Sequence, residues 1–214
     1  MQEVRLVNGK AETVVSVDTM RKSDANTIAG GVSGRELMGR AARGIYEAVA
    51  WKEPIAILAG GGNNGGDGYA LAALLAEGGF QPVVYQLSEK LSEDGRFYRE
   101  KALNLGVAIL PWAAGTSLEN RAVVVDALLG TGFHGEVRSP LREAIEAVNR
   151  SGAYVVSVDI SSGLNGDTGE AEVAVHADLT VSIGFFKRGM FRGQGPVVSG
   201  RLVNVDIGIR LTED

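Results

Sequence analysis

The feature that most constrains the fold is an alternation of short apolar runs with amphipathic segments, which begins at Ile55 and continues almost to the end of the chain. The apolar runs show no alternation with polar residues, which is typical of parallel strands covered on both faces. The sequence therefore predicts an α/β fold with a doubly wound, mostly parallel sheet in a three-layer α/β/α arrangement. The predicted strands are 55–60, 82–87, 107–110, 122–128, 154–160, 178–184 and 200–209, and the predicted helices between them are 67–77, 92–105 and 140–150.

The first fifty residues follow a different pattern, which predicts two helices at about 18–29 and 33–50 with two glycines between them. Ser33 followed by Glu36 forms an S-x-x-E capping box, a signature of a helix start. A chain of 214 residues with 45% hydrophobic content can bury one sizeable core. We therefore expect a single domain over residues 1–214.

Composition excludes several classes of function. A net charge of −5 without a cluster of basic residues argues against nucleic-acid binding. The chain has no cysteine and only two histidines, His134 and His176, which excludes a disulfide framework, a thiolate nucleophile and a three-histidine metal site. There is no basic and apolar leader and no apolar run near the roughly 18 residues that span a bilayer. We expect a cytoplasmic protein that binds neither membranes nor nucleic acid.

The glycine-rich segment GGGNNGGDG, residues 60–68, lies between a predicted strand and a predicted helix. Glycines let the backbone approach an anion closely, and a helix N-terminus supplies free N–H groups. This segment predicts binding of the phosphates of a nucleotide-like ligand; the alternative is a flexible turn. Gly60, Gly62 and Gly65 also match G-x-G-x-x-G, but the second strand offers Gln86 where a dehydrogenase needs an acidic residue for the ribose. A nicotinamide-dependent oxidoreductase is thus the less favoured alternative.

Two further predicted strands end in oxygen-bearing side chains beside glycines. Asp126 closes one strand, and Asp159 and Ser162 follow another. Each residue taken alone could simply cap a turn. Because the carboxyl ends of parallel strands meet at one edge, we expect a shared site there.

A carboxylate beside a phosphate-binding loop would repel the ligand unless a cation or a proton intervenes. Asn64, Asp126 and Ser162 offer hard oxygen ligands of low total charge, which suit a weakly bound cation better than zinc or copper. Lys187 remains open between a phosphate or substrate contact and a solvated surface lysine. Met38 and Met190 are interpreted as packing residues.

Several segments of the chain resemble one family closely. They are NNGGDG at 63–68, VDALLGTGFHGE at 125–136, VDISSG at 158–163, FFKRG around Lys187 and the closing VNVDIGI, with looser matches in MRKSDANTI and ELMGRAARG. In order and spacing they resemble the NAD(P)H-hydrate epimerase family, the YjeF N-terminal domain.

The resemblance implies a Rossmann-like homodimeric isomerase of nucleotide repair. Such proteins interconvert the R and S epimers of hydrated NADH and NADPH, called NADHX and NADPHX, and the S form then goes to a dehydratase. A potassium ion would be bound by Asn64, Asp126 and Ser162. The implied substrate contacts are Asn63, Asn64, Gly65, Gly66, Asp67, Gly130, Thr131, Gly132, Phe133, His134, Gly135, Glu136 and Asp159.

Three departures from the family pattern accompany the resemblance. Ser161 stands where the family usually has proline, and Gly39 and Ala42 stand where it commonly has an acidic residue and a glycine. Bacterial members are often fused to a dehydratase domain, and nothing of that kind follows Asp214. We therefore expect the dehydratase activity on a separate protein, or the chain to be one domain of a bifunctional enzyme.

Epimerisation of the hydrated ring needs a group that donates and accepts a proton, and Asp159 is the candidate catalytic residue. Alternatively, Asp159 holds the ribose or the ring amide. Ring opening and reclosure is a second chemical route, and a non-catalytic nucleotide-binding scaffold is a second kind of function. The sequence leaves the choice between NADHX and NADPHX open.

Overall fold

The computed structural model describes residues 2–212, which form an α/β fold around a seven-stranded sheet. The order of the strands is β10-β8-β7-β6-β3-β4-β5, and all neighbours pair in parallel. This confirms the predicted fold class and places the closing strand at an edge. The strands are β3 (Ile55–Ala59), β4 (Val83–Gln86), β5 (Ala108–Pro111), β6 (Val123–Ala127), β7 (Tyr154–Val158), β8 (Leu179–Ile183) and β10 (Arg201–Val205).

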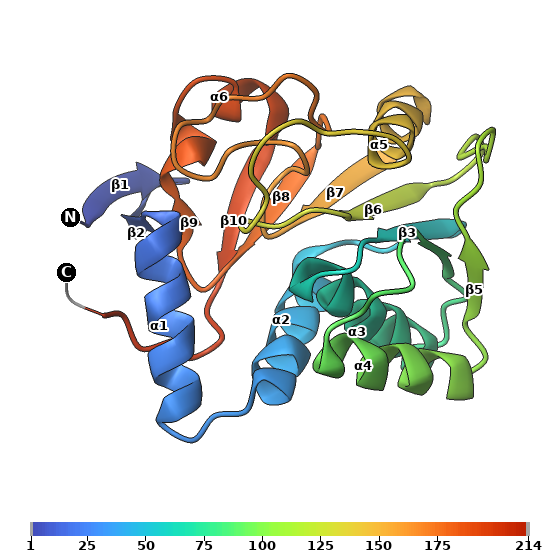
Figure 1. Ribbon diagram of the computed structural model, residues 1–214, viewed down its shortest axis with the longest axis horizontal. Helices are drawn as coiled ribbons and strands as arrows, with labels where there is room; N and C mark the ends of the chain where they lie inside the picture. The colour runs from blue at the N-terminus through green and yellow to red at the C-terminus, as the bar shows by residue number, and fades with distance from the viewer. Residues whose placement is uncertain (1, 213–214) are drawn as a thin grey trace.

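Helices cover both faces of the sheet, with α5 and α6 on one face and α2, α3 and α4 on the other (Figure 1). The central strands are buried on both sides, so they need apolar residues at every position. Ile57 of β3 packs in the core beneath α2 and α3, whereas the next residue, Leu58, packs with Ile145 of α5. The helical segments are α1 (Val17–Ala29), α2 (Gly34–Ala48), α3 (Asn63–Glu77), α4 (Glu93–Asn104), α5 (Leu141–Arg150), the 3₁₀ turn η1 (Arg188–Phe191) and α6 (Gly195–Val198).

Strands β3 and β6 form the switch point of the sheet. From β3 the chain proceeds outward through β4 to β5, returns to β6 beside β3, and then proceeds the opposite way through β7, β8 and β10. The connections that leave β3 and β6 therefore diverge and open a crevice at the carboxyl ends of these strands. Ligands bind at such crevices in doubly wound sheets.

Most predicted helix starts are confirmed by side-chain caps. The hydroxyl of Ser33 accepts a hydrogen bond from the Glu36 N–H at 3.1 Å, and Ser92 caps α4 in the same way through Gly95 at 3.1 Å. Helices α3 and α5 have no side-chain cap, and α3 begins at Asn63 rather than at the predicted position, residue 67. The motif NNGGDG is thus the start of a helix and not a loop.

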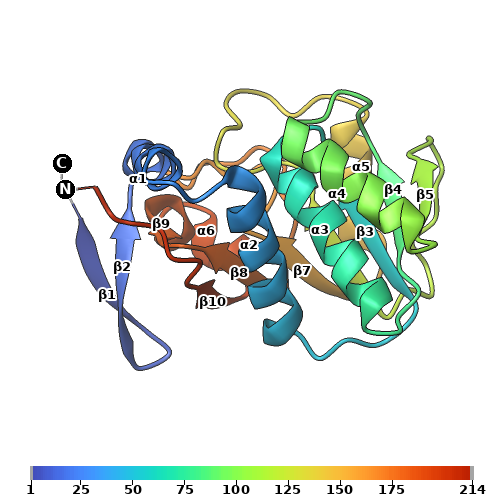
Figure 2. The same ribbon diagram turned by 90° about the horizontal axis from the view of Figure 1, so that it is seen from below.

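A small second sheet was absent from the sequence-based prediction. The hairpin of β1 (Glu3–Val7) and β2 (Lys10–Val15) turns at Asn8 and Gly9, and β2 pairs in parallel with β9 (Phe186–Lys187). Figure 2 shows this hairpin at the end of the molecule, beside α1. Its pairing places Val15 opposite Lys187, so the N-terminal segment helps to fix that lysine.

No helix within residues 2–212 combines the length and the apolar character needed to cross a bilayer.

Candidate functional site

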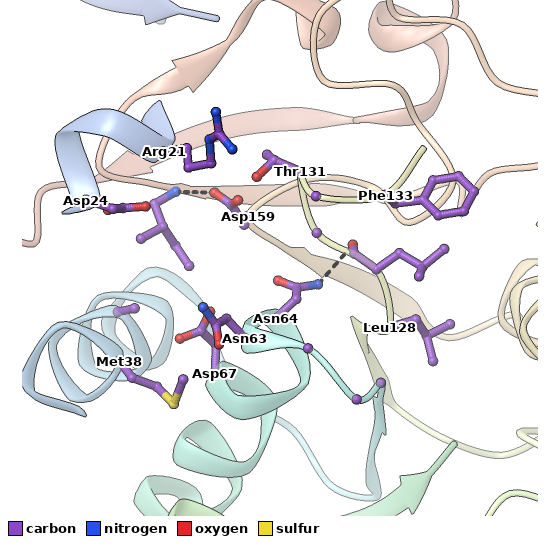
Figure 3. Close-up of a pocket in the computed structure, with 18 of the residues that line it drawn as sticks. Arg21, Asp24, Met38, Asn63, Asn64, Asp67, Leu128, Thr131, Phe133 and Asp159 are labelled. Atoms are coloured by element: carbon purple, nitrogen blue, oxygen red, sulfur yellow. Dashed lines mark hydrogen bonds between the residues drawn. The ribbon is translucent and has the colours of Figure 1, made fainter. Parts of the chain in front are cut away.

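A cavity of about 820 Å³ lies at the switch point (Figure 3). Its walls come from the turn after β3, the start of α3, the loop after β6, the residue after β7, and helices α1 and α2. A volume of this size is typical of small-molecule sites. Of the residues predicted at strand ends, Asn64 and Asp159 line this cavity, whereas Asp126 and Ser162 do not.

The turn Gly60–Gly62 and the first residues of α3 form one wall of the cavity. Gly62 precedes the helix without a side-chain cap, and Asn63 and Asn64 of the first turn line the cavity. The first N–H groups of a helix have no partner within the helix and carry partial positive charge. This wall can therefore receive an anionic group such as a phosphate.

Two of the glycines in NNGGDG serve packing. Gly65 and Gly66 are buried and do not line the cavity. A Cβ atom at Gly65 would overlap the carbonyl oxygen of Gly60, and one at Gly66 would overlap the end of Met38. These glycines let α3 start close to β3 and α2, which fixes the direction of its N-terminus.

Asn64 and Ser162 meet at the carbonyl group of Leu129 in the cavity wall, and the fully buried Asp126 lies behind Ser162. The Asn64 side-chain amide donates to this carbonyl at 3.1 Å, and the Ser162 hydroxyl lies 3.2 Å from it. The same hydroxyl lies 2.5 Å from a carboxyl oxygen of Asp126. Oxygen atoms of Leu129, Ser162 and Asp126 thus lie close to the side-chain amide of Asn64, and these residues come from three segments of the chain.

Two properties of this oxygen cluster suit a cation of low charge. Asn64 Oδ1 is buried and has no hydrogen-bond partner among the described residues. Asp126 is fully buried, and this burial raises the pKa of its carboxyl although Ser162 and Ser157 donate hydrogen bonds to it. A cation there would satisfy Asn64 Oδ1 and favour the carboxylate form of Asp126. In the part of the chain that the structure describes, no three His, Cys, Asp or Glu side chains are arranged to hold a metal.

Asp159 follows β7 directly and lines the cavity. Its φ angle is 65°, in the left-handed region that Asp tolerates better than most side chains. This turn directs the carboxyl towards the end of β8, where it accepts a hydrogen bond from the Ile183 N–H at 3.0 Å. The ammonium group of Lys187 forms an ion pair with the same carboxyl.

Lys187 occupies a place that differs from both sequence-based interpretations. Its side chain is fully buried, so it is not a solvated surface lysine, and it does not line the cavity as a substrate contact would. Besides Asp159, its ammonium group donates to the Ile183 carbonyl at 3.0 Å and to the Ser182 hydroxyl at 3.3 Å. Lys187 therefore fixes Asp159 from behind.

The loop that follows β6 divides between two cavities. Gly130, Thr131, Gly132 and Phe133 line the principal cavity. His134 and Gly135, together with Phe133, line a second cavity of about 450 Å³. Glu136 lines neither cavity and forms an ion pair with Arg138 at 3.2 Å. The first half of the predicted 130–136 segment is thus the half that faces the site.

The cavity also contains two carboxyls at positions of unusual electrostatics. Asp24 of α1 was not among the sequence-based candidates; partial burial and the proximity of Asp159 raise its pKa to about 6, although Lys187 opposes the shift. Asp67 of α3 was expected at the site, and burial followed by Asp159 and Asp24 raises its pKa well above the usual range. Nothing in the local sequence distinguishes Asp24 from other polar residues of its helix.

The structure accounts for two departures from the family pattern. The buried hydroxyl of Ser161 lies 3.2 Å from the Val198 carbonyl, so a hydrogen bond restrains the loop where a proline ring would. A Cβ atom at Gly39 would lie 2.6 Å from the Tyr98 hydroxyl, which fills the space beside α2. Ala42 is buried in the core.

The fold and the site define a doubly wound α/β protein with a ligand cavity at the switch point of its sheet. A family model described as YjeF-related protein N-terminus matches residues 34–189. The chain belongs to this family.

Similar proteins include both short and long relatives. The chain is 33% identical to the NAD(P)H-hydrate epimerase of Limosilactobacillus reuteri, over 90% of this chain and 94% of that protein. It is 38% identical to the bifunctional NAD(P)H-hydrate repair enzyme Nnr of Methanothermobacter thermautotrophicus and 36% identical to that of Coxiella burnetii, over 95% and 89% of this chain. The chain spans 42% and 40% of the length of these two relatives.

A crystal structure of the yeast protein ynu0 has the same fold. It superposes with a TM-score of 0.72 over 89% of this chain and 86% of the yeast chain, at 22% sequence identity.

Proposed function

We propose that the chain is an NAD(P)H-hydrate epimerase, an isomerase that interconverts the R and S epimers of hydrated NADH and NADPH. The observation that carries the proposal is the Asp159 carboxyl at the cavity wall, fixed by the buried Lys187. Family membership and the L. reuteri relative, which the chain matches over nearly its whole length, support the same activity.

We propose an orientation of the hydrated nucleotide in the cavity on electrostatic grounds. Its phosphates bind at Gly60–Gly62 and the N-terminus of α3, where the helix offers partial positive charge. The hydrated ring then lies towards Asp159. Burial raises the pKa of the Asp67 carboxyl, which favours its protonated form and so reduces its repulsion of the phosphates.

The chemistry requires inversion at the ring carbon that bears the hydroxyl. When an acid protonates this hydroxyl, the ring nitrogen donates its electron pair, the C–O bond breaks and water leaves. A water molecule then adds to the other face of the planar cation and loses a proton to a base. Asp159 is the base or acid at one face, and Lys187 and the Ile183 N–H hold its carboxyl in position.

Removal of the Asp159 carboxyl is the first test of this mechanism. We predict that Asp159→Asn still folds, because Asn tolerates a positive φ angle and its side-chain oxygen can accept the Lys187 hydrogen bond. The buried Lys187 loses its counter-charge, so the variant should be less stable than the wild type, and its turnover should fall by about 10²-fold or more. Circular dichroism measures the fold, and a coupled assay with an S-specific dehydratase measures turnover. Full activity of the folded variant would remove Asp159 from the mechanism.

The alternative route through ring opening is distinguished by the fate of the oxygen atom. Loss and return of water introduces an oxygen from solvent at each inversion, whereas opening and reclosure of the ring does not require this exchange. In water labelled with heavy oxygen, we expect one labelled oxygen for each epimer formed. Inversion without label, measured by mass spectrometry at early times, would favour the ring-opening route.

We propose that the oxygen cluster binds potassium through Asn64, Asp126 and Ser162. The unpartnered oxygen of Asn64 and the single carboxylate among neutral oxygens support a monovalent cation. A bound ion would supply positive charge beside the cavity. We predict that Asp126→Ala abolishes any dependence of activity on potassium, measured against sodium at equal ionic strength; an unchanged potassium response would contradict this ligand set.

We further propose a cytoplasmic homodimer whose product passes to a dehydratase. The bifunctional relatives support the coupling, because their names unite repair activities in one protein.

A non-catalytic scaffold would bind the hydrate without inverting it. An oxidoreductase of this fold would need an acidic residue at the end of β4 to bind the ribose. This position is Gln86, which is not acidic and whose side-chain oxygen already accepts a hydrogen bond from Arg99 at 2.7 Å.

A further inference from the structure

The cavity contains a second proton-transfer candidate, Asp24 of α1, which lies outside the part of the chain that the family model matches. Its carboxyl is half-buried and takes part in no described hydrogen bond or ion pair. By contrast, Asp18 on the same helix is exposed and pairs with Arg21 at 2.8 Å and with Lys22 at 2.7 Å. Asp24 is therefore a carboxyl that faces the site without a structural partner.

The chemistry of inversion requires groups at both faces of the ring. The hydroxyl leaves from one face and water adds to the other, so one proton is delivered and one is removed on opposite sides. Asp159 cannot serve both sides, because the Ile183 N–H and Lys187 hold its carboxyl and its backbone has a restricted conformation. A second titratable group must therefore reach the ring from another wall.

Asp24 fits this requirement better than its neighbours. Asp67 belongs to α3, the helix whose start receives the phosphates. Arg21 is exposed and paired with Asp18, and it remains protonated at any working pH. Figure 3 shows Asp24 and Asp159 on different elements around the same open space. Asp159, Asp67 and Arg21 line the same cavity as Asp24, and the Lys187 ammonium group acts on Asp24 from behind Asp159.

We propose that Asp24 is a catalytic residue that works as a pair with Asp159 on opposite faces of the hydrated ring. In one direction, protonated Asp24 gives its proton to the leaving hydroxyl, and ionised Asp159 takes a proton from the entering water. In the other direction the roles are exchanged. One water leaves and one enters, and the pair keeps one proton in total. This proposal rests on the proposed epimerase activity.

The raised pKa of Asp24 supports the acid role, since a group with a pKa of about 6 holds a proton for part of the time near neutrality. The Lys187 ammonium group holds the Asp159 carboxyl at the cavity wall, where it can accept a proton from water. The active form of the pair has one proton, so kcat/KM of the wild type should fall as the pH rises above about 6, as the last shared proton is lost.

The experiment compares the wild type, Asp24→Asn, Asp159→Asn and the matched control Asp18→Asn with R-enriched NADHX, after subtraction of the reaction in buffer. We expect wild-type kcat for Asp18→Asn, and for Asp24→Asn a loss of about 10²-fold in kcat with KM within about threefold. The remaining activity of Asp24→Asn should also lack the alkaline fall in its pH profile.

The possible outcomes separate this proposal from the proposed function. An active wild type with an equally active Asp24→Asn would overturn the role of Asp24 and leave the epimerase assignment intact. A loss confined to KM, or a variant that keeps the alkaline fall, would also overturn it. A folded wild type that does not accelerate inversion would overturn both proposals.

Discussion

At the scale of single residues, Asp24 shows how a site can reduce the stability of the fold. Its carboxyl ionises at a pKa near 3.8 in the unfolded chain but at about 6 in the folded protein. The unfolded state therefore loses its proton first as the pH rises, and the folded state loses relative stability between about pH 4 and pH 6. Above this window the cost is complete.

This difference predicts that Asp24→Asn stabilises the protein at neutral and alkaline pH. Because Asp24 is only half-buried and solvent screens its charge, we expect about 1 kcal/mol in the free energy of unfolding at about pH 8. The gain should shrink towards zero at about pH 4. Urea denaturation of both proteins across this range measures it, and a gain that is independent of pH would contradict the assigned shift.

Some residues of the site could be predicted from the sequence, and others could not. Asn64, Asp126, Asp159 and Ser162 were predicted to converge because polar residues at strand ends are few and the topology brings them together. Lys187 could not be placed, since its burial depends on pairing with β2, far away in the sequence. Asp24 was missed because a helix carries many polar residues and only its packing decides which one faces a cavity.

At the scale of elements, helix α3 determines the geometry of the ligand end of the cavity. Propensity predicted a loop for NNGGDG because Asn and Gly are poor helix formers. The tertiary structure overrides this preference, because a helix start at Asn63 brings Gly65 against Gly60 and Gly66 against Met38. The overlooked hairpin did have a local signal in the sequence, the Asn8-Gly9 pair, which is typical of a tight hairpin turn. The φ angles of these residues, 51° and 79°, are those that such a turn requires.

The close packing of α3 predicts a contrast between two glycines. Gly65→Ala should lower the free energy of unfolding by about 2–4 kcal/mol, because its Cβ atom would overlap backbone and α3 would have to move. At Gly62 a Cβ atom would meet nothing within 4 Å and the φ angle is negative, so Gly62→Ala should cost about 1 kcal/mol or less. Chemical denaturation measures both variants, and equal costs would refute the packing role of Gly65.

At the scale of the whole molecule, the strand order explains why these residues share a site. The chain reverses its direction of progress between β5 and β6, so β3 and β6 become neighbours although β4 and β5 lie between them in the sequence. The apolar runs predicted the parallel sheet and its helices. They could not specify the second sheet of β1, β2 and β9, because β2 pairs with β9 across most of the chain.

The proposed activity of this cavity is the inversion of hydrated nicotinamide nucleotides. The most direct measurement follows R-enriched NADHX by chromatography with catalytic amounts of the wild type, with Asp159→Asn, and in buffer alone. We predict that the R-to-S ratio approaches equilibrium at least about 10²-fold faster with the wild type than with the variant. Equal rates in all three samples would contradict the claim.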